Sequence, residues 1–141
     1  FIHAGQEYGM TKKMIGNSYN SGDDINGFDY IMAKKRIDCI NYLKDAIKLK
    51  KQLPFLSSDS KKEMTDHVTF ENISNGCLLI RSRINEDDYY LFINPTGNTI
   101  SYQFDNYAKV IFNEAGLLDD NHFSQLIMIN KYSLAVAKVT R

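Results

Sequence analysis

Apolar residues recur at helical spacing in the first half of the chain, at Ala33, Ile37, Ile40, Leu43 and Ile47. The spacings of four, three, three and four residues predict a helix from about Tyr30 to Leu53. Asp29 is placed to cap the N-terminal end of this helix, and Pro54 ends it. We expect the isoleucines of the stripe to pack beneath the part of the chain that follows, or across a dimer contact.

Short β-rich runs replace this pattern in the second half of the chain. Seven such runs, among them "CLLIRSRI", "YYLFIN" and "SLAVAKV", alternate with turn signals such as "SNG" and "NPTGN". This order is typical of an antiparallel sandwich, and we expect about six to eight strands. Within "YYLFIN", Tyr90 and Phe92 fall on one face and Leu91 on the other, which predicts one buried side for each sheet.

Three further stretches carry weaker patterns. Phe1 to Ala4 are expected to be the end of a buried strand, and a long polar loop that includes "NSYNSGDDINGFDY" follows them. Loops of this length are uncommon in compact domains and are often functional. Between the helix and the β-rich runs, "SSDSKKEMTDH" offers a capping Ser or Asp before Lys61, which predicts one or two helical turns.

Composition and charge narrow the choice of partners. The chain has 141 residues, which suits one ordinary domain, with 17 Lys and Arg against 17 Asp and Glu. A net charge of zero gives no electrostatic case for nucleic acid or an anionic membrane as a partner. No apolar run approaches the ~18–20 residues of a membrane span, and the compartment, cytoplasmic or secreted, stays open. We expect Cys39 and Cys77 to be small buried hydrophobes rather than a disulfide.

No metal or other cofactor is expected. The acidic run "GDDINGFD" invites comparison with an EF-hand loop, but the spacing fails. If Gly27 takes the sixth position, the first falls on Gly22 and the twelfth on Ala33, and neither residue is a ligand. The three histidines lie far apart, without a paired Cys or His, which argues against zinc.

A family resemblance rests on motifs in a fixed order. "FIHAGQE", "TKK", "NSYNSGDDIN" and then "YLKDAIKLKKQLPF" and "EMTDHVTF" occur in turn over residues 1–70. This segment resembles the region after the eighth barrel strand of type I pullulanases, the α-1,6-debranching members of the α-amylase superfamily (glycoside hydrolase family 13). Tyr30 stands where that family generally has Trp, and Lys50 where it usually has Arg. The rest of the chain is similar only as a β-rich tail.

The resemblance implies a fold class and a division of the chain. The fold is expected to be mainly β, an antiparallel β-sandwich C-terminal domain preceded by the last strand, loop and helix of a (β/α)8 barrel. Residues 1–56 would be the barrel remnant, 57–66 a linker and 67–141 the all-β domain. Because the chain starts on an apolar segment rather than on Met, we expect the natural protein to extend before Phe1.

The resemblance also implies a function, the cleavage of α-1,6-glucosidic linkages in pullulan and branched α-glucans. Enzymes of the family use a carboxylate nucleophile, a general acid/base and a third acidic residue, all on earlier barrel strands. From "HVTF" onward the sequence offers no two acids on a rigid frame facing a cleft, as a retaining pair requires. We therefore expect this chain alone to be inactive, with no catalytic residue in it. Its α-glucan partner, whether pullulan, glycogen or amylopectin branches, would bind chiefly through the barrel, and self-association of the isolated chain stays open.

Two places are candidates for contact with substrate or for its support. Tyr19, Asn20, Ser21 and Asp23 would lie on the loop after the eighth strand, where amide, hydroxyl and carboxylate groups suit sugar hydroxyls. The alternative is an Asx-rich turn that satisfies its own backbone. Glu7 would support the active site through hydrogen bonds, or would be a structural carboxylate bound to loop N–H groups.

A stand-alone carbohydrate-binding or interaction module is the competing function. Sugar-binding sandwiches usually display two or three coplanar aromatic rings, and Tyr89, Tyr90, Tyr102 and Tyr107 could serve. The chain has no Trp, and tyrosines are equally at home in cross-strand pairs.

Overall fold

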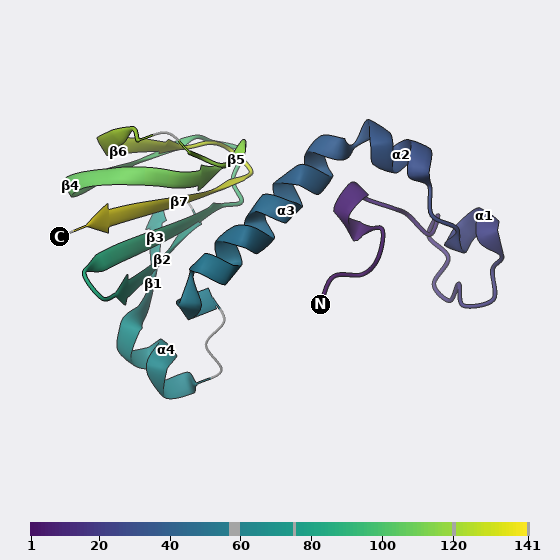
Figure 1. The fold of residues 1–141 in the computed structure, drawn as a ribbon, viewed down its shortest axis with the longest axis horizontal. Coiled ribbons are helices and arrows are strands. Elements are labelled where there is room, and N and C mark those ends of the chain that lie inside the picture. Colours follow the sequence, from purple (N-terminus) through teal and green to yellow (C-terminus); the bar gives the residue numbers. More distant parts are fainter. Residues whose placement is uncertain (57–59, 75, 120, 141) are drawn as a thin grey trace. The chain divides into compact units, whose positions relative to one another are not determined.

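The computed structural model describes residues 1–56, 60–74, 76–119 and 121–140 (Figure 1). It consists of two compact units, Phe1–Lys44 and Asp45–Arg141, which meet inside one helix and are described separately below. The first unit contains η1 (Gln6–Tyr8), α1 (Asp23–Asn26), α2 (Tyr30–Lys35) and the start of α3 (Ile37–Gln52). The second continues with η2 (Pro54–Leu56), α4 (Lys61–His67), β1 (Val68–Ser74), β2 (Cys77–Ile84), β3 (Asp87–Asn94), β4 (Ile100–Asn113), β5 (Gly116–Leu117), β6 (Phe123–Ile129) and β7 (Ser133–Thr140).

The long helix predicted from the apolar spacing is present as two helices. Asp29 caps α2, because the Met32 N–H donates to Asp29 Oδ1 at 2.8 Å. The helical path is interrupted at Arg36, whose backbone lies outside the α region, and α3 resumes at Ile37. The predicted span from Tyr30 to Leu53 is therefore confirmed to within a residue at each end, with one break.

The predicted strand at the N-terminus is wrong. Phe1 to Ala4 form no strand, and the side chains of Phe1 and Ile2 are exposed. All residues of the Phe1–Lys44 unit are described, and none of them forms a strand. A strand needs a neighbour for its backbone N–H and C=O groups, and an apolar run alone does not provide one.

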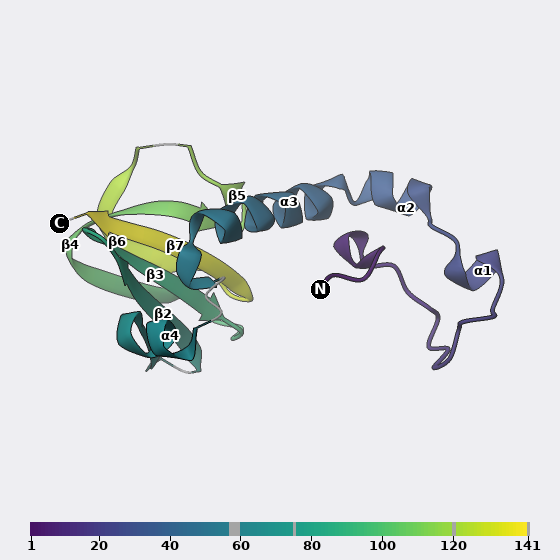
Figure 2. The ribbon, with the colours of Figure 1, turned by 60° about the horizontal axis from the view of Figure 1, so that its bottom comes forward.

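The second unit is an antiparallel sheet of seven strands in the described part, as the alternating runs predicted. The strand order is β1-β2-β3-β7-β4-β5, and β6 pairs with β4 (Figures 1 and 2). The long strand β4 pairs with β7 through its second half and with β6 through both halves. Its first half lies over the face of β3, since the Phe92 and Tyr102 rings are 5.0 Å apart. The sheet thus folds over itself and encloses a core, which is the sandwich expected from the sequence.

The core lies between the β2-β3-β7 layer and the β4-β6 layer. Phe92 at its centre is 0% exposed and packs against Phe104 and Tyr102. The other members of this cluster are Leu79, Tyr90, Ala108, Ile127, Ile129, Ala135, Ala137 and Val139. Every second residue of β3 and β7 points into this core, which explains why these strands alternate in the sequence.

The opposite face of β3 is also covered, so the prediction of one buried side is wrong for this strand. Leu91 is 6% exposed although it points away from the core around Phe92. The end of α3 and η2 lie on this second face, where the rings of Phe55 and Tyr89 are 6.4 Å apart. A helix end that covers a sheet face cannot be inferred from the alternation within one strand.

The helix α3 buries a different stripe from the one predicted. Ile37 and Ile47 are 47% and 38% exposed, whereas Leu49 and Leu53 are 4% and 1% exposed. Leu49 lies in the last turn of α3 and Leu53 directly follows the helix, both in the unit that contains the sheet. Their burial follows from the sheet face beside them, which no helical spacing encodes.

Substitutions in this helix and directly after it should separate the two stripes. Leu53→Ala is expected to lower the free energy of unfolding by about 2–5 kcal/mol, because it removes buried apolar atoms and leaves a cavity. Ile47→Ala, at a partly exposed position of α3, should cost less than about 1 kcal/mol. A urea titration followed by circular dichroism measures both values. Equal losses would show that α3 buries its isoleucines instead.

The two cysteines differ in burial. Cys77 in β2 is 0% exposed, as predicted, and burial raises the pKa of its thiol. Cys39 in α3 is exposed, which corrects the prediction of a buried residue. Both thiols are free.

The helix α4 agrees with the sequence pattern, whereas η1 and α1 lie where a polar loop was expected. The two turns of α4 confirm the helical turns predicted at Lys61, while most of the proposed capping stretch, residues 57–59, lies outside the described residues. Across the described part of the chain, no helix is long and apolar enough to cross a membrane.

Candidate functional site

The polar loop of the first unit is held by its own side chains. Lys12 Nζ donates to the Ile25 carbonyl oxygen at 3.2 Å and to Asn26 Oδ1 at 3.1 Å. Asn26 Nδ2 in turn donates to the Ser18 carbonyl oxygen at 2.6 Å. These bonds tie the segment before the loop, the loop itself and α1 together. The sequence reading missed Lys12 and Asn26, because nothing in their spacing links two residues so far apart.

Of the four residues predicted to contact sugar, Tyr19, Asn20 and Ser21 lie on this braced loop, and Asp23 is the first residue of α1. Tyr19 is 83% exposed, Asn20 and Asp23 are exposed, and Ser21 is half-buried. No hydrogen bond of these four side chains is found within the described residues. The backbone of the turn is hydrogen-bonded by a neighbouring residue instead, since Asn17 Oδ1 accepts from the Tyr19 N–H at 3.5 Å. The loop can therefore offer a phenol ring, an amide, a hydroxyl and a carboxylate to a ligand without breaking its own bonds.

Glu7 binds the backbone of the turn that it belongs to. Its Oε2 accepts from the Gly5 N–H at 2.9 Å, and its side chain is half-buried. Gly5 has a φ of 91°, and a Cβ there would lie 2.6 Å from Met10 Sδ, so this turn requires glycine. This bond fits a structural carboxylate, and the support of an active site by Glu7 stays a prediction.

A further hydrogen bond connects the N-terminal turn to Arg36, the residue between α2 and α3. Arg36 Nη1 donates to the Tyr8 carbonyl oxygen at 2.9 Å, and Tyr8 is 3% exposed. A Cβ on Gly9 would lie 2.7 Å from the same guanidinium nitrogen, so the close approach of Arg36 depends on glycine at this position. The interruption of the helix at Arg36 thus coincides with a contact that positions the N-terminal turn.

The acidic run beside the loop forms a short helix rather than a cation loop. Asp23 and Asp24 lie in the first turn of α1. Their negative charges interact favourably there with the positive end of the helix dipole. In the ranges that the structure describes, no group of three or more His, Cys, Asp and Glu could hold a metal ion.

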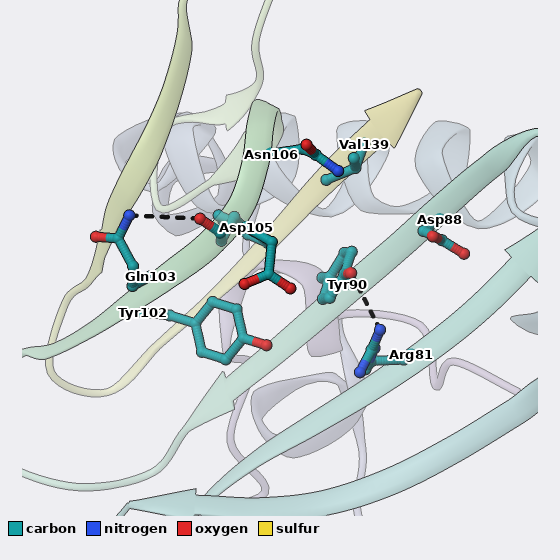
Figure 3. Close-up of a pocket in the computed structure, with 9 residues that line it drawn as sticks. Arg81, Asp88, Tyr90, Tyr102, Gln103, Asp105, Asn106 and Val139 are labelled. Carbon is teal, nitrogen blue, oxygen red and sulfur yellow. Dashed lines mark hydrogen bonds between the residues drawn. The ribbon is translucent and has the colours of Figure 1, made fainter. Parts of the chain in front are cut away.

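The second unit contains a pocket of about 470 Å³ at the open end of its core (Figure 3). Tyr90 on β3 and Tyr102 on β4 line it, and Arg81 on β2 lies across from Tyr90. Asp105 in β4 turns its carboxylate toward the space between the two tyrosines (Figure 3). Core-facing positions of β2 and β3 thus change from apolar to polar as they reach this mouth.

The tyrosines proposed as a flat sugar platform do not form one. The rings of Tyr90 and Tyr102 are inclined by 50°, and Tyr90 is 8% exposed. Tyr89 points to the opposite face of β3, toward Phe55. Tyr107 is 65% exposed and does not line the pocket. A coplanar stacking surface, the main feature expected of a stand-alone sugar-binding sandwich, is therefore missing from these four residues.

Two carboxylates do line this pocket, contrary to the expectation from the sequence. They are Asp88 on β3 and Asp105 on β4. Asp88 accepts a charge-assisted hydrogen bond from Arg83 Nε at 2.9 Å, and its carboxylate points away from Asp105 (Figure 3). A retaining pair needs two carboxyl groups facing each other ~5–5.5 Å apart across a sugar. This arrangement is not of that kind.

Part of the sequence is similar to that of a curated relative. Over 68 residues, or 48% of this chain and 10% of the relative, the chain is 34% identical to a pullulanase of Bacillus subtilis (strain 168). No protein-family model matches the chain.

Solved pullulanases share the fold of nearly the whole chain. The type I pullulanase of Bacillus subtilis str. 168, crystallised with maltose, has a TM-score of 0.88 at 20% identity, over 100% of this chain and 21% of that chain. The pullulanase of Anoxybacillus sp. LM18-11, crystallised with maltotetraose, has a TM-score of 0.85 at 21% identity, over 98% of this chain and 20% of that one. The chain spans about a tenth of the curated relative and about a fifth of these solved chains. The resemblance drawn from residues 1–70 is confirmed, and the chain has the fold of the C-terminal part of a type I pullulanase.

Proposed function

We propose that this chain is the C-terminal part of a debranching glycoside hydrolase that cleaves α-1,6-glucosidic linkages in pullulan and branched α-glucans. In this proposal residues 1–56 belong to the catalytic barrel, 57–66 are a linker and 67–141 are the β-domain. The catalytic acids belong to the rest of the longer enzyme, and this chain contributes a loop that contacts the substrate. The relatives crystallised with maltose and maltotetraose support an α-glucan as the ligand.

The braced loop is the observation that carries this proposal. Loops that follow barrel strands build the active-site face of such enzymes. Here Lys12 and Asn26 satisfy the backbone, and the side chains of Tyr19 and Asn20 remain available. An amide both donates and accepts hydrogen bonds, as a sugar hydroxyl does, and a phenol ring suits the apolar face of a pyranose. A pre-formed loop also loses little conformational entropy when a ligand binds.

Replacing Asn20 in the longer enzyme tests the role of this loop. Asn20→Ala is expected to lower kcat/KM on pullulan by about 3- to 10-fold, because one hydrogen bond contributes roughly 0.5–1.5 kcal/mol. Asn41→Ala, an exposed asparagine of α3, serves as the control and should leave kcat/KM unchanged. The measurement is the release of reducing ends from pullulan at several substrate concentrations. An unchanged kcat/KM for Asn20→Ala would contradict the proposed contact with substrate.

A further inference from the structure

The pocket of the second unit is built by cross-strand pairs that become polar in steps. Leu79 pairs with Phe92 deep in the core, Arg81 pairs with Tyr90, and Arg83 pairs with Asp88 at the mouth. Arg81 Nη2 donates to the Tyr90 hydroxyl at 3.2 Å, and its guanidinium lies 4.9 Å from the centre of the same ring. The floor of the pocket is therefore fixed by bonds inside the sheet.

A bulge in β4 supplies the opposite wall. Gln103 pairs with Leu126 and Ala108 pairs with Ser124, so residues 104–107 have no partner on β6, where only Gln125 lies between the two pairs. Gln125 Nε2 donates to the Asp105 carbonyl oxygen at 3.2 Å and holds the bulge. Bulges re-aim side chains and are frequent beside functional sites. Here the bulge brings Asp105 to the mouth of the pocket.

Polar groups of the pocket remain without partners. The Tyr102 hydroxyl and the Asp105 carboxylate make no hydrogen bond within the part of the chain that the structure describes. Burial raises the pKa of the Tyr102 phenol, so the hydroxyl is a neutral donor and acceptor at ordinary pH. Tyr102 is only half-buried and Asp105 is exposed, so both polar groups are accessible to a ligand in the pocket.

An adjoining pocket of about 510 Å³ shares Arg81 and Asp88 with the first. Ser82 also lines it, and this residue is 3% exposed. Its Oγ makes no hydrogen bond to any described residue. Ser82 pairs with Tyr89, on the face of the sheet opposite Arg81 and Tyr90, so its hydroxyl is not one of the groups that face Tyr102 and Asp105.

The charges around the pocket favour a neutral ligand. Arg81 forms an ion pair with Glu71 at 3.8 Å and Asp88 one with Arg83 at 2.9 Å, while Asp105 adds a carboxylate to the same lining. A phosphate or carboxylate ligand would meet the Asp105 carboxylate, and a simple cation would meet Arg81. A polyhydroxyl compound can both accept from the guanidinium and donate to the carboxylate. The volume of about 470 Å³ is within the ~300–1,000 Å³ of small-molecule pockets.

We propose that this pocket binds a glucosyl unit of an α-glucan, at a place on the β-domain separate from the Tyr19–Asp23 loop. The choice of a neutral sugar rests on the pocket itself. The choice of an α-glucan rests on the proposed function. The site is a binding site only, and it would hold a branch or a neighbouring chain of the polymer while the barrel acts on the linkage.

Nuclear magnetic resonance on the 15N-labelled 141-residue chain tests this site, with maltotetraose as the ligand. The amides of residues 102–106 are expected to shift in a saturable way, with a dissociation constant of about 1 mM or weaker, since one sugar unit offers few contacts. Tyr102→Phe and Asp105→Ala should each raise this constant by about 3- to 10-fold. Both variants are expected to fold, because neither side chain has a hydrogen bond to lose within the described residues.

Two controls make the outcome decisive. Tyr107→Phe changes another β4 tyrosine, exposed and outside the pocket, and should leave the dissociation constant unchanged. Inorganic phosphate should cause no shift at residues 102–106. The proposal is overturned if maltotetraose shifts nothing there, if the pocket variants bind as tightly as the unchanged chain, or if phosphate binds in its place.

The pocket and the proposed function can fail independently. Asn20→Ala should leave the binding at residues 102–106 unchanged, whereas it should lower pullulan cleavage in the longer enzyme. Loss of sugar binding at the pocket with cleavage still sensitive to Asn20 would reject the pocket alone. Sugar binding at the pocket in a longer protein that does not cleave pullulan would reject the debranching function alone.

Discussion

Phe92→Ala is expected to lower the free energy of unfolding of the second unit, the β unit (Asp45–Arg141), by about 3–5 kcal/mol. This is the usual cost of truncating a buried phenylalanine side chain. Phe92 is 0% exposed and lies between the two layers of the sheet. Its ring packs against Tyr102 at 5.0 Å and Phe104 at 6.2 Å between centroids. The substitution therefore removes apolar burial and two aromatic contacts, and the surrounding strands cannot close the cavity without breaking their register.

The matched control is another phenylalanine of the same sheet. Phe70 in β1 is 59% exposed, and Phe70→Ala should change the free energy of unfolding by less than about 1 kcal/mol. Denaturant titrations followed by near-ultraviolet circular dichroism report on the aromatic core in both variants. If Phe92→Ala and Phe70→Ala lower the free energy of unfolding by the same amount, the core is not where the structure places it.

The sheet could be predicted from the sequence because its signals are local. Runs such as "YYLFIN" and "SLAVAKV" alternate with turns, and this alternation alone predicts antiparallel strands. The helix from Tyr30 was predicted for the same reason, with its cap at Asp29. Period and caps are properties of neighbouring residues, which is why these elements could be predicted within a few positions.

Features that depend on distant partners could not be predicted. The second buried face of β3 depends on Leu53 and Phe55, which arrive from the end of a helix. The exposure of Ile37 and Ile47 has the same origin, because helical spacing marks an apolar stripe without saying what covers it. Phe1 to Ala4 were expected to form a strand from their apolar character, and no strand neighbours them in their unit.

The candidate loop and the pocket differ in how far the sequence predicts them. Tyr19, Asn20, Ser21 and Asp23 were named through the family resemblance, and their use by a substrate remains a prediction. Their bracing by Lys12 was not foreseen, since that lysine precedes the loop in the sequence. The pocket brings Arg81, Tyr90 and Tyr102 together from β2, β3 and β4, and only the folded strand order creates that neighbourhood.

Catalysis by the isolated chain is expected to be absent altogether, the largest effect considered for this protein. Hydrolysis of a glycosidic bond requires an acid and a nucleophile or base held on opposite sides of one sugar. Asp88 and Asp105 share a pocket, but Asp88 is bound to Arg83 and faces away from Asp105. Removing single members of a catalytic set already removes most of the rate enhancement, so a chain without the set should have none.

Incubation with pullulan tests this account most directly. The purified 141-residue chain and the full protein encoded by the reading frame that contains it are compared for the release of reducing ends. The isolated chain is expected to match a buffer blank, and the full protein to produce short α-glucan fragments. Turnover by the isolated chain that disappears in Asp105→Ala would place a catalytic site in the β unit, and failure of the full protein to cleave pullulan would contradict the debranching function.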